Sequence, residues 1–231
     1  MNHTIRWLKP IVFLAALGPA SLLIRQLMAR NLRGGPLAEI TNGTGLWALR
    51  FLAVTLAMTP LRRVSGWNGV IRFRRMMGLF AFFYGSLHLG VFVIADRLAS
   101  LGFPTLASWQ TIRDLAASIG TEVYQRPYIA VGLTAWLIML ALALTSTTGM
   151  IRRLGGKRWQ ALHRLVYGAA IMGVVHYWWS VKADVRNPRA YAVVITALLA
   201  YRMVLWTRTL ATSNMQASGR RAVTADSREP C

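Results

Sequence analysis

Two histidines inside long apolar stretches are the residues of this chain best suited to chemistry. His88 stands in GSLHLG and His176 in GVVHYW, and a glycine, Gly85 or Gly173, precedes each histidine by three positions. Residues three apart share a helix face, so each glycine would leave room for the edge of a flat cofactor beside its imidazole. Neutral imidazole is a good ligand for iron, and the repeated pattern indicates the two axial ligands of one haem. The alternative for each histidine alone is a hydrogen bond to a neighbouring helix.

The apolar stretches that contain both histidines are expected to be helices that cross a membrane, and the composition of the chain supports this. The 231 residues are 55% hydrophobic and only 15% charged, with a mean hydropathy of +0.41. Apolar stretches recur at about the length that crosses roughly 30 Å of hydrocarbon. The sequence therefore predicts an all-α fold, a six-helix transmembrane bundle. Its predicted spans are Ile11–Leu27, Gly45–Pro60, Met76–Ala95, Tyr128–Thr148, Leu165–Val181 and Tyr191–Trp206.

The two ends of the chain are interpreted separately. Arg6 and Lys9 before a short apolar core could also belong to a cleaved signal peptide, but the apolar run continues past the possible cleavage point at residues 18–20, which favours a retained span. Residues 208–231 are polar and predict a disordered cytoplasmic tail. The haem-binding transmembrane domain is accordingly predicted to cover residues 1–207.

Basic residues set the predicted orientation. Sixteen Lys and Arg residues fall on one side of the predicted bundle and nine on the other. Positive charge is enriched in cytoplasmic loops, so both termini are predicted to be cytoplasmic and residues 96–126 periplasmic, in a bacterial inner membrane. The net charge of +20 then reflects topology and contacts with anionic membrane lipids, with no nucleic acid as a partner. The sixteen lie within residues 6–9, 62–75, 152–164 and 208–228.

The expected depth of the two histidines in the membrane supports their assignment as a pair. His88 lies 12 residues after Met76, and His176 lies 11 residues after Leu165, on helices that run in the same direction. Both imidazoles are therefore expected roughly 17 Å above the cytoplasmic boundary. The single cysteine is the last residue, Cys231, so Cys-based metal sites are excluded.

Three further residues are candidates for cofactor binding. His163 lies 13 residues before His176 and about 20 Å lower, and its level on the third span is occupied by Arg74. A second bis-histidine haem therefore lacks its partner; His163 is equally consistent with an interfacial hydrogen-bonding role, a single-ligand haem, or a contact to a quinone or flavin. Arg50 lies well inside the second span and is predicted to pair with a haem propionate, although it could snorkel outward.

Several segments together resemble the MsrQ family, formerly called YedZ, of ferric-reductase-like transmembrane domains. They are RRMMGLFAFFYGSLHLGVF, QRPYIAVGLTAWLIMLALALTST and RRLGGKRWQALHRLVYGAAIMGVVHYWW. The resemblance implies a haem b electron-transfer subunit that takes electrons from the quinone pool or a cytoplasmic flavin reductase. It implies as partner a periplasmic molybdopterin methionine sulfoxide reductase, which reduces the substrate in oxidised proteins. FMN is implied as a further cofactor.

Two other functions are alternatives to electron transfer. A proton channel or transporter could use His88 and His176 as a relay, but relays usually include Asp or Glu, and no predicted span contains a carboxylate. An inert membrane anchor would leave both buried histidines unexplained. Under the electron-transfer interpretation, the polar segment 96–126 forms a loop with short surface helices and contributes to docking the periplasmic partner, with Trp109 and Tyr124 as anchors.

Overall fold

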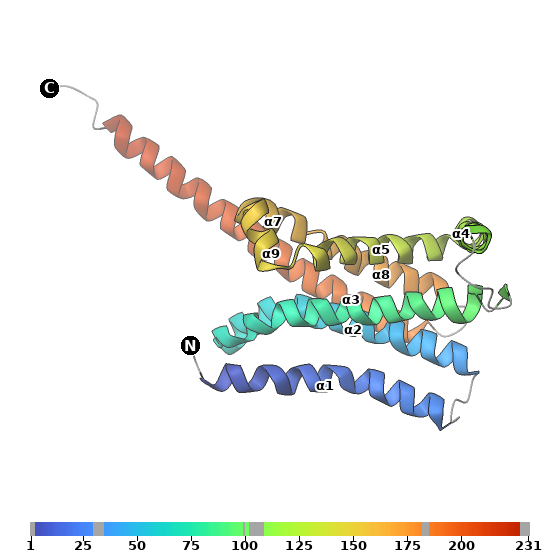
Figure 1. Ribbon diagram of the computed structural model, residues 1–231. Coiled ribbons are helices and arrows are strands. Elements are labelled where there is room, and N and C mark those ends of the chain that lie inside the picture. Colours follow the sequence, from blue (N-terminus) through green and yellow to red (C-terminus); the bar gives the residue numbers. More distant parts are fainter. Residues whose placement is uncertain (1–2, 30–34, 99, 102–108, 182–184, 227–231) are drawn as a thin grey trace.

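The chain folds as a bundle of antiparallel helices. The computed structural model (Figure 1) describes residues 3–29, 35–98, 100–101, 109–181 and 185–226, and the residues within these ranges form no strand. The all-α prediction is confirmed over this part of the chain. The helices are α1 (His3–Met28), α2 (Pro36–Ser65), α3 (Arg74–Val91), α4 (Trp109–Gln125), α5 (Pro127–Leu144), α6 (Thr148–Leu154), α7 (Gly156–His163), α8 (Val166–Ser180) and α9 (Arg186–Asp226).

Among the described residues, five helical segments are long and apolar enough to cross a membrane. They are Arg6–Met28, Leu37–Ser65, Asn68–Ala95, Pro127–Leu144 and Arg186–Arg208. The predicted span Leu165–Val181 corresponds to α8, which has only 15 residues, but α8 runs alongside the spanning helices and connects the two ends of the bundle (Figure 1). The predicted count of six spans therefore stays a prediction, as does the cytoplasmic location of the termini.

Helix α1 is fastened to the bundle at its proline. Pro19 lies inside α1 and has no N–H to give to the helix ladder. One turn of the ladder at this point is bridged by the buried hydroxyl of Tyr84, which accepts from the Ala20 amide (3.0 Å) and donates to the Ala16 carbonyl (2.8 Å). A side chain inserted between amide and carbonyl is an established cause of helix bending. This link connects α1 to α3, and the retention of α1 as a first span stays a prediction.

The core between α2 and α3 is aromatic. Phe51 of α2 stacks on Tyr84 of α3, with 5.3 Å between ring centroids and 15° between ring planes, and on Phe80 at 5.5 Å. Trp47 contacts Phe51 and Tyr84 from the same helix face of α2. Side chains that bury this much apolar area dominate packing, so the cluster fixes α2 against α3 and with them the backbone that faces His88.

The two ends of the bundle differ. After α3, a π-helical segment, η2 (Phe92–Leu98), leads toward α4, which lies across one end and is seen almost end-on in Figure 1. The predicted polar loop 96–126 thus contains a 17-residue helix, longer than the short helices expected. A 3₁₀ segment, η1 (Asn68–Phe73), lies at the opposite end with α6 and α7.

Helix α9 is longer than the predicted last span. It continues to Asp226, across most of the segment for which the sequence predicts disorder, and its C-terminal part projects beyond the bundle at the same end as the N-terminus (Figure 1). The assignment of residues 208–231 to a disordered tail, and the domain boundary at 207, stay predictions.

Candidate haem site between α3 and α8

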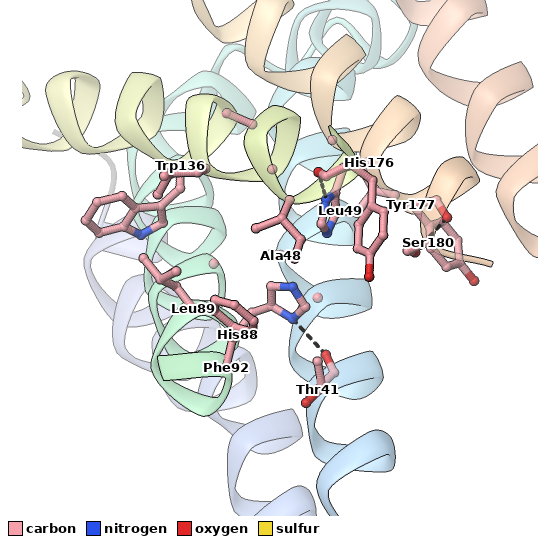
Figure 2. Close-up of a pocket in the computed structure, with 18 of the residues that line it drawn as sticks. Thr41, Ala48, Leu49, His88, Leu89, Phe92, Trp136, His176, Tyr177 and Ser180 are labelled. Atoms are coloured by element: carbon pink, nitrogen blue, oxygen red, sulfur yellow. Dashed lines mark hydrogen bonds between the residues drawn. The ribbon is translucent and has the colours of Figure 1, made fainter. Parts of the chain in front are cut away.

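A cavity of about 360 Å³ lies between α2, α3, α5 and α8 and holds the two predicted ligands. The size falls within the range of cofactor and ligand pockets. His88 reaches the cavity from α3 and His176 from α8, and Figure 2 shows both rings directed into it. Apolar side chains such as Leu49 and Trp136 form much of its wall.

The two imidazoles face each other. Their ring centroids are 5.8 Å apart and their planes are nearly perpendicular, at 83°. Metal–imidazole bonds of about 2 Å on opposite sides of one ion place two ring centroids about 6 Å apart. The observed spacing therefore fits two axial ligands of a single metal ion.

Each ring is oriented by a backbone carbonyl on a neighbouring helix. The distance from His88 Nδ1 to the Thr41 carbonyl oxygen is 2.9 Å, and from His176 Nδ1 to the Tyr128 carbonyl oxygen 2.6 Å. A carbonyl can only accept, so each Nδ1 carries the proton and each Nε2 keeps its lone pair for a metal. Metal-ligating histidines are usually oriented in this way, because the donated bond fixes the tautomer and raises the basicity of the other nitrogen.

A glycine permits each close approach. Gly45 lies four residues after Thr41 and Gly132 four residues after Tyr128, so each glycine is stacked one helical turn from the accepting carbonyl. A Cβ added at Gly132 would lie 2.5 Å from His176 Nδ1, and one at Gly45 would lie 3.0 Å from His88 Nδ1. The two histidines thus rest in matched backbone notches on α5 and α2.

The predicted glycines also line the cavity, but their surroundings differ. A Cβ at Gly85 would first meet the flexible end of Met139, at 3.1 Å, and one at Gly173 would meet Leu49 in ordinary contact at 3.5 Å. Their proposed role beside the edge of a cofactor stays a prediction. The sequence analysis does not identify the role of Gly45 and Gly132. Each is a small residue at the same level as a histidine on the neighbouring helix.

The residues present suit an iron that is already held by a macrocycle. In the described ranges, no group of three or more His, Cys, Asp or Glu side chains is placed to hold a metal ion. Haem iron needs only axial ligands from the protein, since the porphyrin supplies the others. Two opposed imidazoles with free Nε2 atoms, in an apolar cavity, meet that need.

The arginine at the cavity is different from the one predicted. The structure does not bring Arg50 to the histidines: its Nε donates to the Tyr191 hydroxyl at 2.9 Å, and its guanidinium lies 4.5 Å from the centroid of the Trp47 ring. Arg126 lines the cavity instead and pairs with Glu122 at 3.2 Å. Arg126 thus lies at the cavity with Glu122 as its partner, and the pairing of Arg50 with a propionate stays a prediction.

His163 and Arg74 lie away from this cavity. His163 Nδ1 lies 3.1 Å from the Trp159 carbonyl, its Nε2 lies 3.4 Å from Ser146 Oγ, and its ring stacks on that of Trp159 with centroids 3.9 Å apart. Burial lowers the pKa of His163 below its ordinary value; the hydrogen bond to the Trp159 carbonyl opposes this shift, and the charge of Arg74 adds to it. His163 is therefore harder to protonate than a free imidazole, with Arg74 nearby as the sequence count indicates.

Comparison with known proteins assigns the chain to a family. Residues 44–174 match the family model described as ferric reductase like transmembrane component. A protein of Xanthomonas euvesicatoria pv. vesicatoria named protein-methionine-sulfoxide reductase heme-binding subunit MsrQ is 44% identical over 201 residues, which cover 84% of this chain and 85% of that protein. Proteins of the same name are 43% identical in Herminiimonas arsenicoxydans (86% and 85% covered) and 44% identical in Azospira oryzae (85% and 78% covered).

These matches extend over nearly the whole helical bundle. The family model includes His88 and His163 and ends at Val174, two residues before His176. The apolar helices and the matched transmembrane family together identify a multi-pass membrane protein. The chain belongs to the MsrQ family of ferric-reductase-like transmembrane proteins.

Proposed function

We propose that the cavity between α3 and α8 binds haem b, with His88 and His176 as its axial ligands. The observation that carries this proposal is the pair of opposed imidazoles, 5.8 Å apart, each donating Nδ1–H to a carbonyl and turning Nε2 into the cavity. The relatives are named as heme-binding subunits, which supports the same cofactor here.

The surrounding residues have separate tasks in this site. The Thr41 and Tyr128 carbonyls hold the two rings in position and make the ligating nitrogens more electron-rich. Arg126 binds a propionate, since a guanidinium and a carboxylate form charge-assisted hydrogen bonds. Trp136 and Leu49 exclude water from the cavity, which stabilises the less charged form of a bound redox centre.

We further propose that the chain is an electron-transfer subunit of a methionine sulfoxide reductase system. A haem iron accepts and releases one electron at a time. Reduction of a sulfoxide to a thioether consumes two electrons and two protons and releases water, and this step belongs to the partner subunit. The proposed partner is a periplasmic molybdopterin reductase, and the proposed donor is the quinone pool or a cytoplasmic flavin reductase. FMN stays a prediction to which no residues are assigned.

Orientation decides the direction of electron flow. We place both termini in the cytoplasm of a bacterial inner membrane, with α8 as a sixth crossing. The histidine pair then lies in the outer half of the bundle, because Thr41 and Tyr128 lie close to the outer ends of α2 and α5. His163 and Arg74 lie toward the opposite face, where a donor would deliver electrons.

An optical spectrum of the purified protein tests the cofactor directly. A Soret band that shifts on reduction, with resolved α and β bands, is the expected result. Protein from haem-replete cells that shows no such bands would instead favour the proton channel, in which the same histidines carry protons. Measuring how many electrons the reduced protein delivers to the purified partner then tests the electron-transfer role.

A further inference from the structure

Arg202 is a second arginine inside a predicted span, and the sequence analysis assigns no role to it. Its Nη1 donates to the Tyr167 hydroxyl at 2.6 Å, and its Nη2 donates to Thr59 Oγ1 at 2.7 Å and to the Leu56 carbonyl at 3.2 Å. Its Nε is buried and has no hydrogen-bond partner among the described residues. Every acceptor that these bonds reach is neutral, so the positive charge of Arg202 is not balanced by them.

Other basic side chains converge on the same place. The Arg74 side chain lies close enough to Tyr167 and Arg202 to interact electrostatically with both. His163 is near enough to Arg74 to sense that charge. Arg74 comes from α3, His163 from α7 and Arg202 from α9, so three elements far apart in the sequence build one basic cluster around Tyr167 of α8.

No carboxylate of the nearby helices balances this cluster. The sequence has no Asp or Glu between Glu39 and Asp96, or between Glu122 and Asp184. Helix α9 carries none from Arg186 to Arg208. Two partly buried guanidinium groups that repel each other are costly unless an anion accompanies them. The charges of Arg74 and Arg202 therefore have no carboxylate counter-ion on these helices.

We propose that Arg74 and Arg202 bind a phosphate group at the end of the bundle opposite the haem cavity. Guanidinium groups present planar, paired donors that match phosphate oxygens, and the unpartnered Nε of Arg202 is such a donor. Arg202 is only six residues from Arg208, or about 9 Å along the helix, which places it near the level of lipid headgroups. The site is separate from the haem cavity and does not depend on it.

The phosphate could be supplied by an anionic phospholipid or by a soluble phosphate compound. The exposed arginines that surround this end favour either source, since they raise the local concentration of anions. These arginines include Arg62, Arg63, Arg75, Arg152 and Arg153. The two sources share the chemistry that Arg74 and Arg202 recognise, and they differ in whether acyl chains are attached.

Native mass spectrometry of the full-length holoprotein in neutral detergent distinguishes these cases. The probes are dioleoylphosphatidylglycerol, dioleoylglycerol with the same acyl chains and no phosphate, and inorganic phosphate. Wild-type protein is expected to bind the phospholipid or inorganic phosphate, and to bind dioleoylglycerol at least about tenfold more weakly, which is about 1.4 kcal/mol. Preference for the phospholipid identifies a lipid source, and equal binding of inorganic phosphate identifies a soluble one.

Two variants of Arg202 and one control variant test whether phosphate binds at this basic cluster. Arg202→Gln should weaken phosphate binding about tenfold or more, and Arg202→Lys, which keeps the charge but loses the fork, on the order of threefold. Arg189→Gln removes an exposed arginine near the other end of α9 and should leave binding unchanged. Wild-type binding in both Arg202 variants, an equal loss in Arg189→Gln, or wild-type protein that prefers neither phosphate probe to dioleoylglycerol overturns the proposal.

Discussion

His88 and His176 face each other 5.8 Å apart, and each is held by a carbonyl that lies one helical turn from a glycine. The two halves of this arrangement come from different helix pairs: α2 supports the histidine of α3, and α5 supports the histidine of α8. Such a pair is already in place to ligate metal, because neither ring must change its tautomer to present Nε2. The site is thus built from backbone geometry as much as from the ligands themselves.

Replacing the histidines one at a time should separate ligands from neighbours. The methyl group of alanine cannot ligate iron in place of an imidazole. His88→Ala and His176→Ala are therefore each expected to lose most of the haem or to convert it to high spin. His163→Ala should keep the low-spin spectrum, because His163 does not line this cavity, and should slow reduction from the donor side. Optical and electron paramagnetic resonance spectra of the three purified variants measure these effects.

The comparison is informative in both directions. If His163→Ala abolishes the only haem while His88→Ala retains it, the assignment of the axial pair is wrong. If the wild-type protein contains two haems per chain, His163 becomes a ligand of the second one, and Arg74 is the residue that occupies the opposing level.

Adding one methyl group behind a histidine should disturb the site strongly. In Gly132→Ala the new Cβ would lie 2.5 Å from His176 Nδ1, so the ring must move and lose its bond to the Tyr128 carbonyl. Loss of a group that orients a metal ligand typically weakens metal binding about 10- to 100-fold, and we expect a haem deficit of that order. Gly45→Ala should have a smaller effect in the same direction, because its Cβ would lie 3.0 Å from His88 Nδ1.

Gly168→Ala is the matched control for these glycine variants. Gly168 lies on α8 with His176, and an added Cβ there meets no atom within 4 Å. Haem content per protein, measured after reconstitution at limiting haem, should be normal in this variant. Equal haem affinity in Gly132→Ala and Gly168→Ala would show that the notch on α5 does not position His176.

Much of this arrangement follows from local sequence patterns. Apolar stretches of spanning length predict the helices, and equal offsets from the helix starts predict that His88 and His176 share a depth. Both inferences need only the helical rise and the membrane thickness. The sequence predicts a span at Leu165–Val181 because the apolar stretch extends to both of these residues, whereas the helix α8 covers only Val166–Ser180.

The residues that sequence analysis missed depend on contacts between distant segments. A carbonyl that accepts from an imidazole carries no side-chain signal, so Thr41 and Tyr128 were not identified. The rotation of α2 about its own axis decides that Arg50 turns toward Tyr191, and depth alone does not specify this angle. Arg202 lies near the end of the predicted span Tyr191–Trp206, where an arginine resembles an ordinary interfacial residue.

Removing the hydroxyl of Tyr84 should loosen the first helix. Tyr84→Phe deletes the group that bridges the Ala20 amide and the Ala16 carbonyl next to Pro19. Buried backbone groups left without partners cost about 1–3 kcal/mol, so the midpoint of thermal unfolding should fall. Scanning fluorimetry in detergent measures the shift, with Tyr124→Phe as the control, since Tyr124 is 90% exposed. Identical midpoints for the two variants would mean that α1 closes its own ladder without Tyr84.

The orientation of the bundle can be read with a fused reporter. A reporter that is active only in the periplasm should be silent when fused after Trp206, because the basic residues near the ends of the chain favour the cytoplasm. The same reporter inserted before α4, at Leu101, should be active. Activity at both positions would mean that α8 does not cross the membrane. Activity after Trp206 with a silent fusion at Leu101 would mean that the bundle is inverted, which would reverse the expected direction of electron flow.

The exposed aromatic residues of α4 are expected to contribute to docking the reductase partner. Trp109 and Tyr124 are 71% and 90% exposed, whereas Ile119 and Val123 of the same helix line the haem cavity. A partner on this helix would therefore lie close to the edge of the haem site. In Trp109→Ala/Tyr124→Ala, the rate of electron transfer to the purified partner should fall about fivefold or more, as for loss of aromatic anchors in an interface.

The haem spectrum shows whether this double variant remains folded, because displacement of α4 would expose the cavity that Ile119 and Val123 cover. Trp7→Ala is the matched control: Trp7 is 73% exposed and lies near the N-terminal end of α1. Figure 1 shows this end of α1 at the opposite end of the bundle from α4. Its transfer rate should equal that of wild-type protein. If the α4 variant keeps both its spectrum and its transfer rate, the helix serves only to cover the cavity. The partner must then receive electrons at another part of the outer surface.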